Sequence, residues 1–112
     1  MAGYSTAGLN AASDGIAAAG TWIQMHTADP GAAGTTGVTG SRAQTTWGAA
    51  SNGSRTGTQV SIAIGAGVTV THWSLWSASS AGTFLGGFAL SASEAFGAAG
   101  TIQHTPTITS TN

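Results

Sequence analysis

Apolar side chains near the start of the chain recur at spacings of three and four residues, which is the period of one helix face. This pattern predicts a short helix over Ser5–Ala19, and Gly20 supplies the expected stop because glycine commonly follows the last helical turn. The pattern gives one narrow apolar stripe, and the helix is expected to pack across one end of the strands that follow. The stripe consists of Leu9, Ala12, Ile16 and Ala19.

From Thr21 onward the period changes to two, which is typical of strands with one buried face. The alternation is clearest in Thr58–Ile64, where Val60, Ile62 and Ile64 point the same way. The predicted strands are Thr21–Thr27, Arg42–Gly48, Thr58–Ile64, Val68–Trp76, Thr83–Leu90, Glu94–Phe96 and Thr101–Thr109. Short strands after one helix predict a mainly β fold, an antiparallel, jelly-roll-like β-sandwich. We expect one domain over residues 1–112, with the helix in 5–19 and the strands within 21–109.

Turn residues separate the strands. In Asp29-Pro30-Gly31 the proline fixes φ, the glycine accepts a positive φ and the aspartate bonds its own backbone, so these residues are expected to have a structural role. Gly31–Ser41 is expected to be a surface loop that is ordered by what it touches. Ala49–Gly57 is expected to be rich in turns, with Asn52-Gly53 as its turn signal. Pro106 predicts an edge or a bulge in the last strand.

Two strands carry irregularities. The apolar residues of Val68–Trp76 switch faces midway, so we expect either a bulge near His72 or burial of both faces. Gly86-Gly87 leaves a gap on the next strand, which a neighbouring backbone or a bulky ring is expected to fill.

The composition is narrow and almost uncharged. Ala, Gly, Ser and Thr make up 71 of the 112 residues, five side chains are charged, the net charge is −1 and there is no cysteine. Without clustered Lys and Arg, nucleic acid and anionic membranes are poor partners, and no membrane segment or cofactor motif is visible. Only 24 residues are large and apolar, so we expect part of the cohesion to come from neighbouring subunits.

The residues that carry chemistry are scattered. His26, His72 and His104 lie on three separate predicted strands without a companion ligand, so a hydrogen-bonded structural role is favoured for each. A metal site formed where His72 and His104 meet across strands is the alternative. His104 shares its parity with Ile102, which predicts a core-facing ring with a backbone partner. The acids are also far apart, which argues against an enzyme and favours solvated or capping roles; they are Asp14, Asp29 and Glu94.

The largest side chains are the candidates for contact with partners. Each tryptophan buries a large apolar area, so a core or interface anchor is favoured over a stacking platform for sugars. The candidate interface residues are Trp22, Trp47, Trp73, Trp76, Arg42 and Arg55.

Several blocks occur in an order that resembles a family of small proteins in phages of actinobacteria, which are described as tail fibre or minor tail proteins. The blocks are His26-Thr27-Ala28-Asp29-Pro30-Gly31, Gly37-Val38-Thr39-Gly40, Arg42, Thr46-Trp47, Gly53-Ser54-Arg55 and Thr71 through Gly87. Members often carry an acid and an aromatic where Gly37 and Ser41 stand here.

The resemblance implies a virion component, a β-sandwich on the outside of the tail or head. We expect a non-enzymatic tail-associated module whose partners are copies of itself and other tail or capsid proteins. The alternatives are a capsid decoration or minor capsid protein, and a carbohydrate-binding module that contacts host glycans. The last of these requires at least two adjacent, exposed tryptophans.

Overall fold

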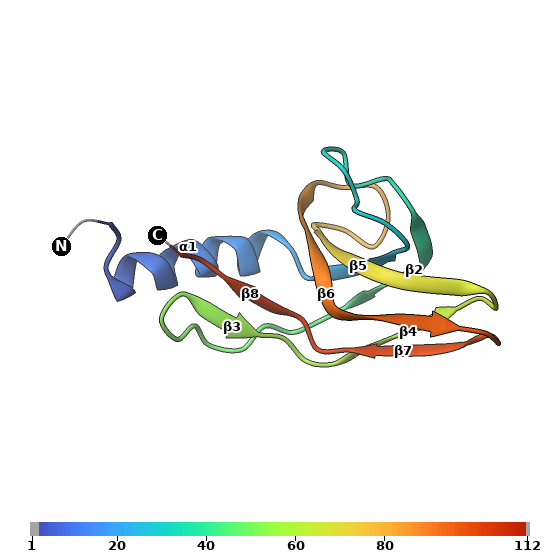
Figure 1. Cartoon of the computed structure of the whole chain (residues 1–112). Coiled ribbons are helices and arrows are strands. Elements are labelled where there is room, and N and C mark those ends of the chain that lie inside the picture. The colour runs from blue at the N-terminus through green and yellow to red at the C-terminus, as the bar shows by residue number, and fades with distance from the viewer. Residues whose placement is uncertain (1–2, 112) are drawn as a thin grey trace.

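The computed structural model describes residues 3–111, which form a sandwich body with a stalk at one end (Figure 1). The molecule measures 50 × 26 × 23 Å along its principal axes. Its Cα radius of gyration of 14.5 Å exceeds the roughly 13 Å of a compact chain of this length. The stalk consists of α1 (Thr6–Ala19) and a small sheet formed by β3 (Ser54–Thr56) and β8 (Thr107–Thr109). The protein is therefore elongated.

The body contains two antiparallel sheets. Their strands are β1 (Trp22–His26), β2 (Val38–Gln44), β4 (Val60–Ile64), β5 (Val68–Trp76), β6 (Phe84–Phe96) and β7 (Gly100–His104). The larger sheet has the order β2-β1-β5-β6, and the smaller one pairs β4 with β7. The prediction of a mainly β, antiparallel sandwich with one short N-terminal helix is confirmed.

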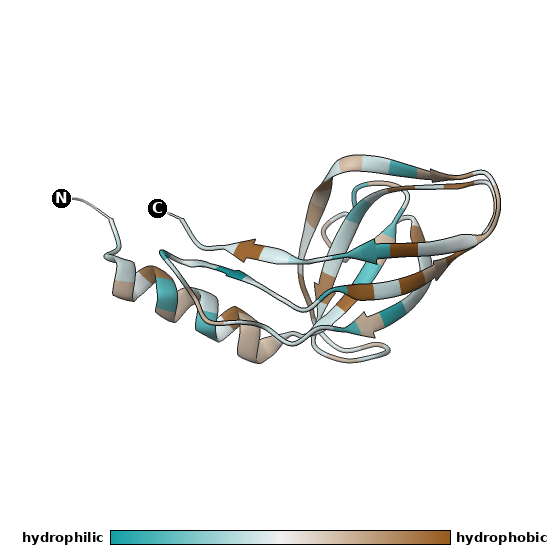
Figure 2. Ribbon diagram, turned by 90° about the horizontal axis from the view of Figure 1, so that it is seen from below, coloured by the Kyte–Doolittle hydropathy of each residue, from teal (hydrophilic) through white to brown (hydrophobic). Residues whose placement is uncertain are grey.

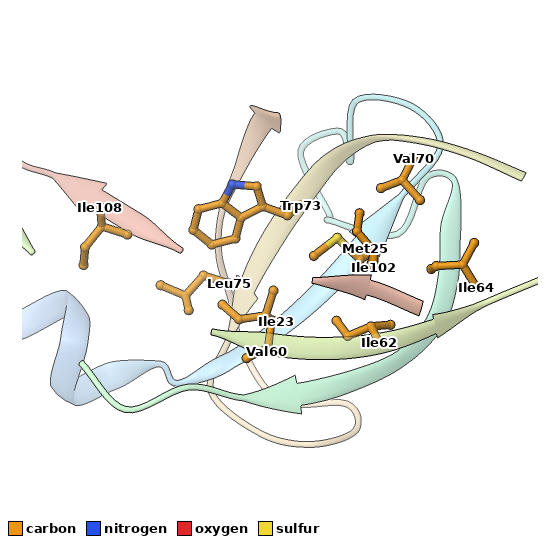
Figure 3. Close-up of a cluster of buried hydrophobic side chains, with 10 residues drawn as sticks. All are labelled: Ile23, Met25, Val60, Ile62, Ile64, Val70, Trp73, Leu75, Ile102 and Ile108. Atoms are coloured by element: carbon orange, nitrogen blue, oxygen red, sulfur yellow. The ribbon is translucent and has the colours of Figure 1, made fainter. Parts of the chain in front are cut away.

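Apolar side chains from both sheets meet between them (Figure 3). On β4 the three predicted inward residues are buried and alternate with exposed Ser61 and Ala63. Ile108 of β8 belongs to the same cluster, so the core extends toward the stalk. The cluster consists of Ile23, Met25, Val60, Ile62, Ile64, Val70, Trp73, Leu75, Ile102 and Ile108. Strongly hydrophobic bands are most frequent in the strands of the body, whereas α1 shows a mixture of pale, hydrophilic and a few hydrophobic bands (Figure 2).

The outer face of the larger sheet is also covered, because the loop between β1 and β2 folds back over it. Pro30 in this loop is buried. A Cβ added at Gly87 would lie 2.8 Å from the Pro30 ring, so the proline fills the gap predicted at Gly86-Gly87. Gly34 packs against the Phe84 ring in the same way. Trp73–Trp76 in β5 is consequently buried on both faces, and the register also shifts between Val70 and His72. Both expected irregularities occur.

The helix contacts the stalk sheet mainly through polar residues. Leu9, the first residue of the apolar stripe, also packs there: it is half-buried, and a Cβ added at Gly53 would lie 2.9 Å from its Cβ. Ser13 and Ala17 are its buried residues within the described chain, and Asn10 Oδ1 accepts a hydrogen bond from the Gly53 N–H (2.7 Å). By contrast, Ile16 is 39% exposed. The rest of the stripe, Ala12, Ile16 and Ala19, is exposed, because hydrogen bonds between polar groups decide which face docks.

Several element boundaries differ from the prediction. β2 begins at Val38 inside the predicted loop and ends before Trp47, which forms only an isolated bridge. Two glycines with positive φ, Gly37 and Gly40, hide its alternating pattern. The predicted turn at Asn52-Gly53 is present, with φ values of 50° and 82°, but β3 follows it directly.

The C-terminal half differs in two more places. β6 is one continuous strand, in which residues 90–93 bulge opposite Thr71 because the register with β5 shifts there. The predicted strand Thr101–Thr109 divides into β7 and β8, because Pro106 has no N–H with which to continue a ladder. The two pieces pair with different partners, β4 and β3.

Candidate functional site

A chain of buried polar groups joins β1, β5 and the loop that covers them. His26 Nδ1 lies 2.7 Å from the Thr36 carbonyl oxygen, and because a carbonyl only accepts, Nδ1 carries the proton. Burial lowers the pKa of His26, so its ring is neutral and Nε2 accepts from Ser74 Oγ (2.6 Å). Ser74 in turn accepts from Trp76 Nε1 (2.8 Å). The side-chain nitrogen and oxygen atoms of His26, Ser74 and Trp76 therefore all have hydrogen-bond partners.

The pair of Ser74 and His26 has the spacing of a nucleophile and its base, but substrate has no access to it. Both residues are 0% exposed. A backbone carbonyl stands at Nδ1, where hydrolases of this type place a carboxylate. The arrangement therefore fixes the loop to the sheet, which is the structural role favoured for His26.

The Arg42 side chain makes its contacts with residues of its own chain. Its guanidinium carbon lies 3.9 Å from the centroid of the Trp76 ring, and Nη1 donates to the carbonyl oxygens of Ala78 (2.9 Å) and Ala81 (2.7 Å). Burial lowers the pKa of Arg42, but a guanidinium still remains charged at neutral pH. The arginine thus closes the loop after β5 over the indole.

Arg55 holds the helix to the stalk sheet. The residue is 9% exposed, its Nε donates to Ser13 Oγ (3.1 Å) and Nη1 donates to the Gly48 carbonyl oxygen (3.3 Å). Nη2 forms an ion pair with Asp14, whose side chain is 67% exposed. Asp14 is thus exposed to solvent, as expected, and it also pairs with a buried arginine from another element, which the sequence did not indicate.

The four tryptophans form no exposed platform. Trp73 and Trp76 are buried, and Trp22 and Trp47 are half-buried. Trp47 Nε1 donates to the Gly20 carbonyl oxygen (2.8 Å), which anchors the end of the helix to the body. The two adjacent, exposed indoles that the carbohydrate interpretation required are not found among them.

A cavity lies where β6 and β7 diverge. Its volume is about 410 Å³, and its walls include Trp73, Leu90 and Glu94 from the larger sheet and Ile102 and His104 from β7. Glu94 stands opposite the buried Val70 in the ladder, and directly opposed residues share a face, so it belongs to the inner face of the sheet. Sequence reasoning missed this position, because the looped-out residues before Glu94 change its parity.

His104 forms part of the same wall. Its ring centroid lies 5.1 Å from that of Trp73, and burial lowers its pKa. Its Nε2 is buried and has no hydrogen-bond partner within residues 3–111, so the predicted core-facing orientation holds but the predicted backbone partner is not found for Nε2.

The alternative of a metal site formed by His72 and His104 is wrong. His72 pairs with His26 on the larger sheet, whereas His104 lies on the smaller one. In residues 3–111 no three His, Cys, Asp or Glu side chains are grouped to hold a metal ion.

The turn residues contact one another as their chemistry indicates. The Gly31 N–H donates to Asp29 Oδ1 (2.9 Å), and Gly31 has a φ of 76°.

Residues 3–111 include no helix with the length and apolar character needed to cross a bilayer.

These features define an elongated β-sandwich module whose polar side chains mostly hold its own loops and stalk together. The chain belongs to the family described as "Podophage GP4 fiber I protein gp80", whose model matches residues 5–109. It is therefore a phage fibre-type structural protein and a component of the virion. No curated protein matches the chain, and no solved structure matches it.

Proposed function

We propose that the chain is a non-enzymatic surface module of a phage tail fibre, and that it assembles with copies of itself and with other virion proteins. The observation that carries this proposal is the position of the apolar stripe on α1. Polar contacts dock the helix on the stalk sheet. Leu9 of the stripe is half-buried, but Ala12, Ile16 and Ala19 are left at the surface. An apolar helix face that its own chain does not cover suits contact with another subunit.

The chemistry of this face favours close association. Ala12 and Ala19 are exposed and Ile16 is partly exposed, so another helix could approach without a bulky obstacle. Asp14 is the helix's one charged residue, and it is paired with Arg55. Like charges on two copies therefore do not oppose contact. Figure 1 shows α1 in the stalk, at one end of the elongated molecule.

The family match favours a fibre over a decoration or minor capsid protein of the head, which is the alternative within the same class. The resemblance to proteins of actinobacterial phages makes such a phage the proposed source. We also propose that residues 1–112 work as one domain, because Ile108 from the stalk sheet shares the core cluster with Ile23 from the body.

Sedimentation analysis of the full chain tests the proposal. We expect an oligomer at micromolar concentration, and we expect Ala12→Glu and Ile16→Glu to shift it to monomer. Ala11→Glu is the matched control, because Ala11 is an exposed alanine on the side of the helix away from the stripe. A monomeric wild-type chain, or equal effects of A12E and A11E with the fold intact, would contradict the proposed interface.

A further inference from the structure

We propose that the Asn52-Gly53 peptide in the stalk is a site of spontaneous deamidation, and that the docked helix α1 protects this peptide through Asn10. Release of the helix then exposes the chain to an irreversible covalent change. Such a site is separate from assembly through the apolar stripe, because it lies against the docked face of α1 and needs no second subunit.

The chemistry follows from the two side chains. Asn52 is followed by a glycine, and a glycine has no Cβ to hinder attack by its backbone nitrogen. The Gly53 nitrogen loses its proton and forms a bond to Cγ of Asn52, and the bond from Cγ to Nδ2 breaks, so that ammonia leaves. Water then opens the succinimide ring on one side or the other, which gives aspartate or isoaspartate. Water is the co-reactant, and nothing is oxidised or reduced.

The turn presents Asn52 to solvent. Asn52 is exposed, and with Gly53 it forms a two-residue loop in which both φ values are positive, 50° and 82°. On either side of the loop, the Ser51 N–H donates to the Ser54 carbonyl oxygen (2.7 Å), and the Ser54 N–H donates to the Ser51 carbonyl oxygen (2.9 Å). Positive φ at both central residues is typical of a type I′ turn. Water and base therefore reach the Asn52 amide.

The attacking nitrogen, by contrast, is held by the helix. The Gly53 N–H donates to Asn10 Oδ1 (2.7 Å), and its carbonyl oxygen accepts from the Ser110 N–H (2.9 Å). A Cβ at Gly53 would lie 2.9 Å from the Leu9 Cβ, so the turn is packed closely against α1. The bond to Asn10 must break before the nitrogen can lose its proton and turn toward the Asn52 side chain. Docking of the helix therefore slows the reaction.

Local opening of the stalk controls the rate of this reaction, because parts of a protein open more often than the whole unfolds. Asn10 and Ser13 hold the helix on the stalk sheet through hydrogen bonds to Gly53 and Arg55. Either product adds a negative charge at the turn, and isoaspartate also adds a carbon to the main chain. The Gly53 N–H is then displaced from Asn10, so a deamidated chain docks its helix less tightly.

Incubation of the full chain at mildly alkaline pH, followed by peptide mapping with mass spectrometry, tests the site. Asn52 should deamidate at least about tenfold more slowly in the folded chain than in the same chain unfolded in urea. Asn10→Ala removes the acceptor of the Gly53 N–H and should accelerate the reaction about threefold or more. Exchange of the Gly53 amide hydrogen should accelerate in parallel.

Asn10→Asp is the matched control, because aspartate keeps an acceptor oxygen at the same place, and its rate should equal that of the wild type. Ser13→Ala loosens the helix without a change in the turn, so it should also accelerate deamidation and serves as the test if N10A does not fold. The proposal is overturned if the folded wild type reacts as fast as the unfolded chain. It is also overturned if N10A and S13A react no faster than the wild type, or if N10D reacts as fast as N10A.

Discussion

Ser74 Oγ lies 2.6 Å from His26 Nε2 in the fully buried layer between the larger sheet and the loop that covers it. The serine also accepts from Trp76, so one hydroxyl satisfies two buried nitrogens. This contact explains how a loop rich in glycine and threonine is ordered on a sheet. The loop is held by directional hydrogen bonds, and Pro30 fits into the gap at Gly87.

Replacement of Ser74 by alanine should therefore destabilise the protein strongly. The change leaves the Trp76 N–H and His26 Nε2 without partners in a buried layer, which costs about 1–3 kcal/mol for each group. We expect the free energy of unfolding, measured by denaturant titration, to fall by about 2–4 kcal/mol. Ser80→Ala in an exposed loop is the control and should change it by less than about 0.5 kcal/mol. Similar losses in the two variants would show that the hydroxyl of Ser74 has no special role.

Stability should also decrease on acidification. Burial lowers the pKa of His26 and of His104 below the ordinary value of 6.5, and at His26 this effect outweighs the hydrogen bond to the Thr36 carbonyl oxygen, which raises the pKa. The unfolded chain therefore binds more protons than the folded chain below pH 6.5, so the stabilisation is complete above that pH. It is lost as the pH falls toward the folded-state pKa values. Melting temperatures measured between about pH 8 and pH 5 should fall with pH, and less steeply in H104F. If the melting temperature did not change over this pH range, the conclusion that His26 and His104 are buried as neutral rings would be contradicted.

Replacement of Arg55 should destabilise the protein more than replacement of Asp14, although the two residues form one ion pair. Arg55→Met removes hydrogen bonds to Ser13 and Gly48 from a buried site, so we expect a loss of about 2 kcal/mol. Asp14→Asn alters only the exposed partner, and a loss below about 1 kcal/mol is expected. Hydrogen exchange of α1 should accelerate in R55M and hardly change in D14N. Equal acceleration in the two variants would assign the docking of the helix to the ion pair alone.

Gly40 should tolerate no side chain, because its φ is 73° and β2 passes close to the Ala63 carbonyl oxygen there. Gly40→Val should lower the free energy of unfolding by about 2 kcal/mol or more. Gly65→Ala is the matched control, since nothing lies within 4 Å of a Cβ at that position and its φ is not positive. If G40V were as stable as G65A, the close approach of β2 to the Ala63 carbonyl oxygen would be contradicted.

The sequence predicted the strands that obey one simple period. β5 was predicted with its observed bounds, and the alternation in β4 identified three core residues, Val60, Ile62 and Ile64. The switch of face within β5 also predicted its bulge. These features are local, so the spacing of side chains along the strand is sufficient to reveal them.

Long-range contacts decided the features that the sequence did not predict. Nothing near Ser13 indicates that a serine and Asn10, rather than the apolar stripe, would face the stalk sheet, because Arg55 and Gly53 lie some 40 residues away. The same holds for Glu94, whose inward position depends on the register of β6 against β5. A single sequence carries no direct signal for such pairings.

Immunogold electron microscopy of purified phage particles, with an antibody raised against this chain, tests the central claim most directly. A fibre module should be labelled on the fibres of intact particles, outside the head. Label over the head, or particles that lack the chain while the infected cell contains it, would contradict the assignment of this protein to the fibre.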